Sequence, residues 1–269
     1  MNNLNLAVAL AKAEKEEEVI AILKENGFWD DYKYWEPYGN KENNYSTIGN
    51  QQSAADAALV EKLINSVDAI LVKECLLRGI APDGSAAPKS MAGAMRDFFG
   101  VTDGKLANID AKQRSNMAGN IILAATGQAR GQECLTIADC GEGQTPKRLP
   151  RTILSIGESN KMKIPFVQGK FNMGGTGALP FCGKNSLQLV ISKRCPEIPN
   201  DGSDDSFDDW SISVVRREDA RDGNRSTMFT YLTDENKQVL RFKSDSLCII
   251  PITSKSGKQE YEDMRYGTY

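Results

Sequence analysis

The stretch 53–78 constrains the fold of this chain most, because it predicts one long helix with a polar stripe on an otherwise apolar surface. Glu61, Asn65 and Asp68 are spaced by four and three residues, so a period of 3.6 residues brings them to one face. The helix would be buried through Leu59, Val60, Leu63, Ile64, Val67, Ile70, Leu71 and Val72. Two carboxylates and an amide on a buried helix are costly unless polar groups meet them. The stripe is therefore either a solvated helix face or one wall of a polar site.

Composition is that of an ordinary globular chain and excludes several kinds of chemistry. Of the 269 residues, 40% are hydrophobic and 26% are charged, and the formal net charge of −3 gives no general attraction to nucleic acid or anionic membranes. The net charge does not exclude a local basic patch that binds nucleic acid. The chain has no histidine, which excludes Ser-His-Asp and Cys-His catalysis and a histidine phosphoacceptor within it. Six cysteines without a C-x-x-C pair predict free thiols and disfavour zinc.

Membrane and secretion signals are missing from the sequence. No apolar run approaches the ~20 residues of a membrane-spanning helix. The chain turns charged soon after its start and lacks the basic, then apolar pattern of a secretion signal. We therefore expect a cytoplasmic protein without membrane contact, and the chain is long enough for one large domain or two small ones.

Hydrophobic periodicity predicts helices interspersed with short strands. Helices are expected over 4–25, 53–78, 91–99 and 111–125, and Ser53 is expected to cap the second of them. Strands are expected over 133–139, 185–194, 210–217, 227–233, 238–242 and 247–251. The economical fold class is α/β of the α+β two-layer sandwich type, with a mixed, mostly antiparallel sheet and helices on one face.

An aromatic segment follows the first predicted helix. Phe28, Trp29, Tyr34 and Trp35 predict an ordered loop that is packed by its own rings. A surface for stacking nucleobases is the alternative. It is disfavoured because acidic residues of the same segment would repel phosphates.

Two glycine-rich segments carry the remaining chemistry. The first, D-C-G-E-G over 139–143, follows a predicted strand, where an aspartate can accept a hydrogen bond from an exocyclic amine and glycines let backbone approach a flat ring. The second, G-K-F-N-M-G-G-T-G over 169–177, predicts free N–H groups for an anion where a loop enters an apolar helix. Each segment alone is equally consistent with a tight turn. Neither matches G-x-G-x-x-G. The segment 177–185 fits a Walker-type loop poorly, because five residues instead of four separate its glycines and Asn185 replaces the hydroxyl.

Taken in order, these motifs resemble the GHKL ATPases (gyrase, Hsp-type chaperones, histidine kinases and MutL), which share the Bergerat nucleotide-binding fold. The resemblance covers about 53–194: E-x-x-x-N-x-x-D-A on a helix, D-x-G-x-G after a strand, a polar segment over 144–173, then a glycine-rich loop and a strand. Tyr266-Gly267-Thr268 is similar to the start of the family's G-T-x-I strand, which we expect to be cut short. The resemblance implies one ATPase domain over 1–269 of a longer bacterial protein.

Within this domain we expect three parts. The first, 1–52, is an N-terminal helix and loop extension. The nucleotide-binding core spans 53–194 and contains a long insertion at 80–132, which is either a partner surface or a cover for the sheet edge. The remaining strands lie in 195–269.

The resemblance also implies roles for individual residues. Asn65 would coordinate a Mg²⁺ ion that bridges the ATP phosphates, Glu61 would activate the attacking water, and Asp139 would accept the adenine amine. Residues 144–173 would form a lid over the nucleotide. The other implied ATP contacts are Asp68, Ala69, Gly141, Gly143, Thr145, Lys170, Gly174, Gly175, Thr176, Gly177 and Thr268. Asn172 departs from the G-x-F-G-x-G of chaperone-like members, which leaves the phosphate contact at that position open.

The implied function is a Mg-dependent ATPase whose lid closure drives dimerisation of two protomers, closest to chaperone, MutL and MORC-like members. A histidine-kinase-like protein kinase is one alternative, which Glu61 and the lack of histidine disfavour. A nucleotide-binding module without turnover is another. The sequence leading into 53–78 is similar to bacterial GHKL proteins encoded among anti-phage defence genes. Expected partners are ATP, a second protomer and an unknown downstream domain or protein.

Overall fold

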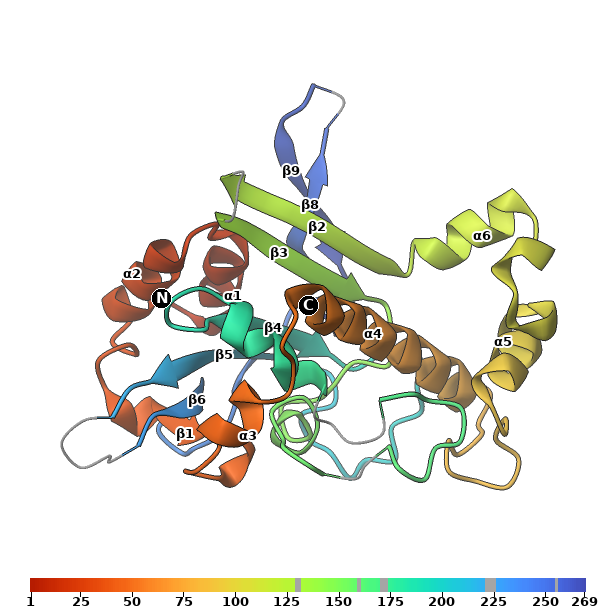
Figure 1. Ribbon diagram of the computed structural model, residues 1–269, viewed down its shortest axis with the longest axis horizontal. Coiled ribbons are helices and arrows are strands. Elements are labelled where there is room, and N and C mark those ends of the chain that lie inside the picture. Colours follow the sequence, from red (N-terminus) through yellow and green to blue (C-terminus); the bar gives the residue numbers. More distant parts are fainter. Residues whose placement is uncertain (129–131, 159–160, 170–173, 221–225, 255) are drawn as a thin grey trace.

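Helices and short strands are interspersed along the chain in the computed structural model, which describes all residues except 129–131, 159–160, 170–173, 221–225 and 255 (Figure 1). The α-helices are α1 Asn3–Lys12, α2 Glu16–Glu25, α3 Tyr45–Gly49, α4 Ala55–Leu77, α5 Met91–Phe99 and α6 Ala111–Ala118. The strands are β1 Trp35–Pro37, β2 Ile121–Gln128, β3 Gln132–Asp139, β4 Gln188–Lys193, β5 Trp210–Glu218, β6 Met228–Leu232, β7 Leu240–Phe242, β8 Leu247–Thr253, β9 Gln259–Met264 and β10 Gly267–Thr268. Among the 3-10 turns are η5 Leu149–Arg151 and η6 Gly174–Phe181.

Eight of the strands form one sheet in the order β1-β6-β5-β4-β10-β3-β2, and β7 joins it through β5. The hairpin β8-β9 forms a separate two-stranded sheet. Every strand pair among the described residues is antiparallel, so the expectation of a mixed sheet is wrong. Parallel neighbours would need a helical crossover between them. In the described part of the chain, the strands that are consecutive in sequence and adjacent in the sheet are joined without a helix. The coarser expectation of an α+β fold built on a large antiparallel sheet is confirmed.

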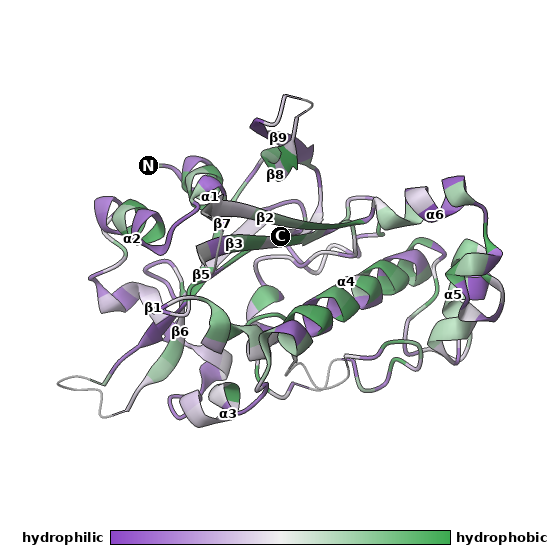
Figure 2. Cartoon of the chain, turned by 45° about the horizontal axis from the view of Figure 1, so that its top comes forward, coloured by the Kyte–Doolittle hydropathy of each residue, from purple (hydrophilic) through white to green (hydrophobic). Residues whose placement is uncertain are grey.

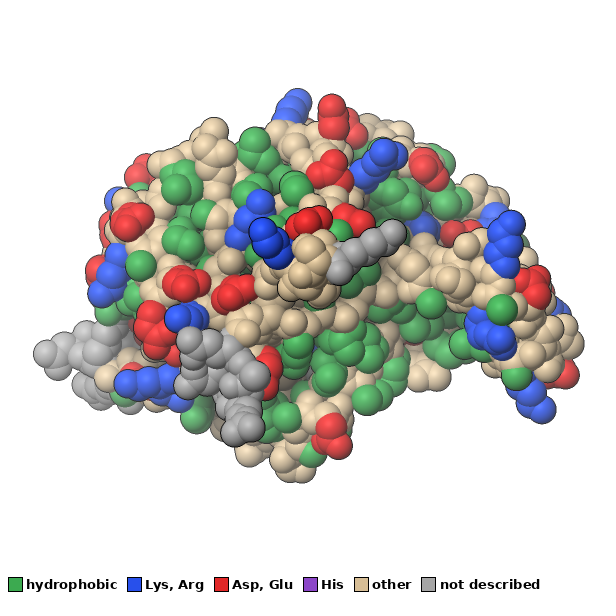
Figure 3. Space-filling view, turned by 90° about the horizontal axis from the view of Figure 1, so that it is seen from above, with side chains coloured by type: hydrophobic (Ala, Val, Ile, Leu, Met, Phe, Trp, Pro, Cys, Tyr) green, Lys and Arg blue, Asp and Glu red, His purple; other side chains and the backbone are tan. Residues whose placement is uncertain are grey.

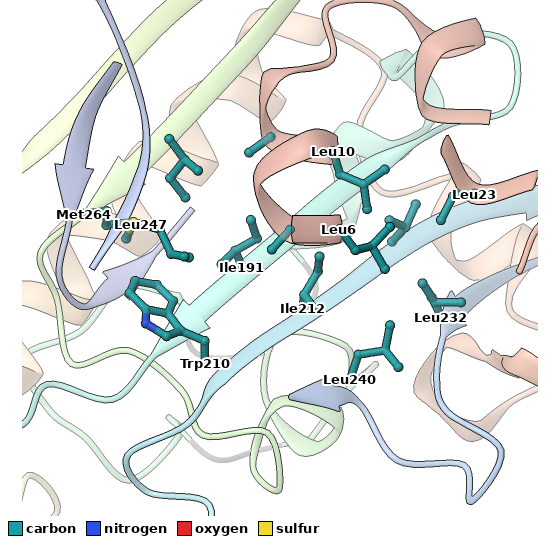
Figure 4. Packing of buried hydrophobic residues seen from close by; sticks show 14 of the residues in the cluster. Leu6, Leu10, Leu23, Ile191, Trp210, Ile212, Leu232, Leu240, Leu247 and Met264 are labelled. Carbon is teal, nitrogen blue, oxygen red and sulfur yellow. The ribbon is translucent and has the colours of Figure 1, made fainter. Parts of the chain in front are cut away.

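Both faces of this sheet are covered, which corrects the expectation of helices on one face. On one face, Ile191 of β4 packs with Leu6 of α1 in a cluster that also holds residues of α2, β5 and β8 (Figure 4). On the other, the adjacent Val190 packs with Ile48 of α3 and Leu179 of η6. Figure 2 shows α3 and α4 on one side of the sheet and α1 and α2 on the other. Because β4 and β5 carry apolar side chains on both faces, a two-layer arrangement would leave one face bare.

The helix α4 crosses β2 and β3 and is held along its C-terminal half by a third cluster. This cluster joins apolar residues of α4 and α5 to Ile164, Phe166 and Val167. Phe98 of α5 meets Phe166 edge to face, with ring centroids 6.2 Å apart. The segment 161–169 is therefore anchored beside α4 by its own apolar side chains.

Three predicted helices differ from those observed. The predicted helix 4–25 is broken into α1 and α2, because Ala13 is extended and the Glu14 N–H bonds the Glu18 carboxylate. The predicted helix 111–125 ends at Ala118, where Gly119-Asn120 breaks it, and its apolar remainder becomes β2. The insertion 80–132 thus supplies an edge strand of the main sheet. Ser53 does not cap α4, which begins at Ala55 without a side-chain cap.

The aromatic segment packs as expected. Phe28 and Tyr34 meet edge to face at 5.0 Å, as do Trp29 and Trp35 at 6.2 Å. The Arg216 guanidinium lies 3.7 Å from the centre of the Trp35 ring, an arrangement that favours a cation over an aromatic face. These rings therefore pack against one another and against Arg216 within the fold.

Charged side chains of both signs are interspersed over the face seen in Figure 3. Within the described residues, the helices are all too short or too polar to cross a bilayer.

Candidate functional site

The polar stripe of α4 meets protein groups along its length. Asp68 is fully buried, whereas Glu61 and Asn65 are half-buried. Glu61 lies against the residues before α4, whereas Asn65 and Asp68 both lie against the end of the segment 161–169. The stripe is therefore one wall of a polar cluster and not a solvated face.

Asp139 is the last residue of β3, and it pairs in register with Thr268 of β10 and Ile121 of β2. Its Oδ1 accepts a hydrogen bond of 2.9 Å from the N–H of Gly141. Burial raises the pKa of Asp139 to about 6, although the Gly141 N–H, the Ser66 hydroxyl and the positive charge of Lys161 act in the opposite direction. The carboxylate is thus held at a strand end at a cost, as expected for a group with a ligand to bind.

The glycines beside Asp139 are required by close packing. A Cβ at Gly141 would lie 2.5 Å from the Cβ of Ala69 and 2.7 Å from Asp139 Oδ1. Gly143 has a φ of +62°, and a Cβ there would lie 1.8 Å from the carbonyl oxygen of Lys193. The motif therefore fixes the end of β3 against α4 and β4, and it leaves backbone next to the buried carboxylate.

Asp68 binds the segment 161–169 to α4. Its carboxylate accepts hydrogen bonds from the backbone N–H of Gln168 at 3.0 Å and of Gly169 at 2.8 Å, and the Lys161 ammonium lies 3.9 Å from Oδ2. A Cβ at Gly169 would lie 2.5 Å from Asn65 Oδ1, so this backbone covers the Asn65 amide. The expectation that Gly169 offers a free N–H to phosphates is wrong for this conformation, because Asp68 already accepts it.

The glycine-rich segment after 173 forms η6, a 3-10 helix, where the sequence predicts an apolar α-helix. Pro180 lies inside it, and three of its eight residues are glycines, which together disfavour an α-helix. Thr176 is buried, and Gly177 packs on Gln52. Gln52 in turn donates a hydrogen bond of 3.1 Å from Nε2 to Glu61 Oε2. Lys170 lies outside the described residues.

Two predicted contacts are engaged by other protein groups. The Thr145 hydroxyl donates a 2.6 Å hydrogen bond to Asp204 Oδ2, in a loop that the motif did not indicate. Thr268 Oγ1 lies 3.0 Å from Ser192 Oγ, which also accepts from the backbone N–H of Gln144 at 2.8 Å. Thr268 therefore helps to join β10 and β4 next to Asp139.

Several polar residues of the cluster were not predicted: Gln52, Ser66, Gln144, Gln168 and Ser192. Gln144 directly follows the glycine motif and is 8% exposed, and its Oε1 finds no hydrogen-bond partner among the described residues. Its position beside D-x-G-x-G is the one signal in the sequence that marks it. The others contact the motif residues only through tertiary structure.

One end of the polar cluster presents acceptors of the kind that an adenine amine needs. They are the buried Asp139 carboxylate and the unpaired Gln144 Oε1, whereas the space beside Gly141 is filled by Ala69. At the other end, Lys161 and Gly169 lie over Asp68 and Asn65, so phosphates require these residues to move. Two shallow surface depressions lie away from this cluster, one between α1 and β8 and one beside α5. Within the described residues, no three His, Cys, Asp or Glu side chains gather to hold a metal, so an ion would need ligands from the nucleotide.

These elements define a class: an α+β protein with one antiparallel sheet between two sets of helices, and two buried carboxylates where α4 meets β3. Comparison of the chain with protein-family models, curated proteins and solved structures gave no match.

Proposed function

We propose that this chain binds ATP with Mg²⁺ and hydrolyses it, in the manner of a Bergerat-fold GHKL ATPase. The observation that carries the proposal is Asp139, a buried carboxylate with a pKa raised to about 6 at a strand end, bordered by Gly141 and backed by Thr268. Burial of such a group destabilises the fold, and a cost of this kind is expected at a functional site. An ionised carboxylate is the acceptor that an adenine amine needs.

The base end of the site is built from Asp139, Gly141 and Ala69. Gly141 lets Ala69 and the Asp139 carboxylate pack directly against its backbone, and the bond of 3.1 Å from the Glu142 N–H to the Ala69 carbonyl fixes the spacing between α4 and the motif. Gln144 Oε1 is a second acceptor at this end. Adenine suits this set of acceptors because its exocyclic amine donates hydrogen bonds, whereas a base edge that presents only carbonyl groups donates none.

The phosphate end involves the half-buried stripe of α4. Asn65 offers an amide oxygen as one ligand for Mg²⁺, with phosphate oxygens and water completing the set. The ion, when bound, neutralises the phosphate charge that builds up during hydrolysis. Glu61, one turn earlier on the same face, orients and deprotonates the attacking water, which typically contributes ~10²–10⁴ in rate.

The segment 161–169 acts as part of a lid in this proposal. Lys161 and the N–H groups of Gln168 and Gly169 occupy Asp68 in the described conformation, and they exchange this carboxylate for phosphates when a nucleotide enters. This change of binding partner in the lid would in turn control the association of two protomers in the cytoplasm. A role in anti-phage defence is the process that we propose for this cycle.

Purified protein with Mg-ATP tests the proposal directly. We expect ATP to raise the melting temperature of the wild type and to be hydrolysed, Asp139→Asn to lose the thermal shift, and Glu61→Ala to keep the shift but lose hydrolysis. The exposed Asp83→Asn is the matched control and should behave as wild type. Unchanged ATP affinity in Asp139→Asn would refute the pocket. A wild type that binds ATP without turnover would favour a nucleotide-binding module.

A further inference from the structure

The residues just before α4 contact the proposed catalytic base. Gln52 lies between α3 and α4, and its Nε2 donates a hydrogen bond of 3.1 Å to Glu61 Oε2. Both side chains are half-buried. The neighbouring Gln51 points elsewhere, since its Nε2 donates to the carbonyl of Thr47 at 2.8 Å. Of the two adjacent glutamines, one therefore contacts Glu61 and the other caps α3.

Gln52 is fixed from its other side by the glycine-rich segment. A Cβ at Gly177 would lie 2.8 Å from Gln52 Cγ and 3.3 Å from its Cβ, so the glutamine stem fills the space that glycine leaves. The turn η6, which contains Gly177, packs against both α3 and α4. The Gln52 side chain is thus held between the glycine-rich segment and the carboxylate of Glu61.

From this geometry we infer that Gln52 is a positioning residue for ATP hydrolysis, which orients Glu61 and reports the state of the glycine-rich segment to it. The inference rests on the proposed function. A carboxylate base needs one oxygen free for water and a fixed direction. The Gln52 amide occupies Oε2 and adds no charge, and Oε1 of Glu61 has no hydrogen-bond partner among the residues that the structure describes. A free glutamate side chain would instead sample many rotamers.

The contact with Gly177 gives this residue a second role. The segment 174–177 is the one proposed to meet the phosphates, so its displacement changes the space around the Gln52 stem. A side chain at position 177 would push Gln52 away from Glu61. Gly177→Ala should therefore lower turnover through the same hydrogen bond.

Steady-state hydrolysis of Mg-ATP by matched variants tests the inference. We expect Gln52→Ala to lower kcat about tenfold, with KM for ATP within twofold of wild type, because it removes alignment and not binding. Gln52→Glu, which has nearly the same size but cannot donate to a carboxylate, should lose at least as much. Gln51→Ala should keep the wild-type kcat, and Gly177→Ala should resemble Gln52→Ala. The melting temperature of each variant is measured first, and kcat is compared only among variants whose melting temperature matches that of the wild type.

The outcomes separate this inference from the proposed function. If Glu61→Ala abolishes hydrolysis while both Gln52 variants keep the wild-type kcat, the positioning role is overturned and the ATPase assignment stands. If Glu61→Ala hydrolyses ATP as the wild type does, or the wild type shows no turnover, both are overturned. A rise in KM without a fall in kcat would assign Gln52 to binding and also overturn the inference.

Discussion

Asp68 and Asp139 are both buried carboxylates, but their surroundings differ. Asp68 accepts two backbone N–H bonds and has Lys161 nearby. Asp139 accepts a hydrogen bond from the Gly141 N–H, but burial outweighs this bond and the effects of Ser66 and Lys161, so its pKa is raised. A carboxylate whose charge is compensated within the protein stabilises the fold, whereas one whose charge is incompletely compensated is available to a ligand.

The raised pKa of Asp139 predicts a pH-dependent effect of Asp139→Asn on stability. Above pH 6 the native state holds an unfavourable charge, and the shift from 3.8 to about 6 is worth on the order of 3 kcal/mol. This penalty is absent below about pH 4, where the carboxyl is protonated in both states. It develops between about pH 4 and 6, where only the unfolded state is ionised, and it is complete above pH 6. We expect the variant to be more stable than wild type at pH 7.5 and similar at pH 4 by urea denaturation. A constant difference at both pH values would contradict this.

Gly143 is predicted to be intolerant of any side chain. Its φ of +62° disfavours alanine, and the Cβ would lie 1.8 Å from the Lys193 carbonyl oxygen, which is backbone and cannot move aside. Gly79 is the matched control, since its φ is +68° but no atom lies within 4 Å of the added Cβ. In urea unfolding we expect Gly79→Ala to cost about 1 kcal/mol and Gly143→Ala to cost several times more or to prevent folding. Equal losses would show that backbone strain alone matters.

At the scale of elements, periodicity predicted α5 with its observed bounds and placed all six predicted strands near their true positions. It failed for 111–125, because an apolar run of that length fits a helix or a strand equally well and the choice depends on pairing with β3. The polar stripe of α4 and the glycine motif after β3 were visible in sequence. Their tertiary partners, Gln52 and the segment 161–169, were not, because no local pattern encodes a contact over such separations.

The attachment of 161–169 to α4 predicts a local effect of Asp68→Asn. An asparagine keeps only one acceptor oxygen for the N–H groups of Gln168 and Gly169, and it lacks the negative charge that strengthens both hydrogen bonds and attracts Lys161. Amide exchange of these two residues should accelerate roughly 10–100-fold, while the sheet keeps its protection. Glu74→Gln on the same helix, which faces Arg78, is the control and should leave them unchanged. Uniform acceleration across the protein would instead indicate global destabilisation.

At the scale of the whole molecule, the middle of the sheet is completed by a strand that is far from its neighbours in sequence. β10 lies between β3 and β4, and Tyr269 exchanges both backbone hydrogen bonds with Ile191. The sequence indicated a strand at 267–268 but not its central place. The extension 1–52 covers the second face through α1 and α2, which local patterns also could not show.

Removal of 266–269 should therefore abolish cooperative folding. The deletion leaves β3 and β4 without a shared neighbour in the middle of the sheet. Tyr269→Phe is the control, since it loses only the hydroxyl contacts with Ala11 and Thr136 and keeps the backbone pairs. We expect about 1 kcal/mol of loss for this control and no sigmoidal thermal transition by circular dichroism for the deletion. A sharp transition in the deletion would show that the sheet tolerates the gap.

The central place of β10 also sets the timing of assembly during synthesis. β3 emerges from the ribosome with Asp139 at its end, but the strand that pairs there is translated much later. At about 5–20 residues per second, this edge waits on the order of ten seconds for its neighbour. During that interval β3 presents an open edge to other nascent chains, so pairing with a wrong strand competes with completion of the sheet around Asp139.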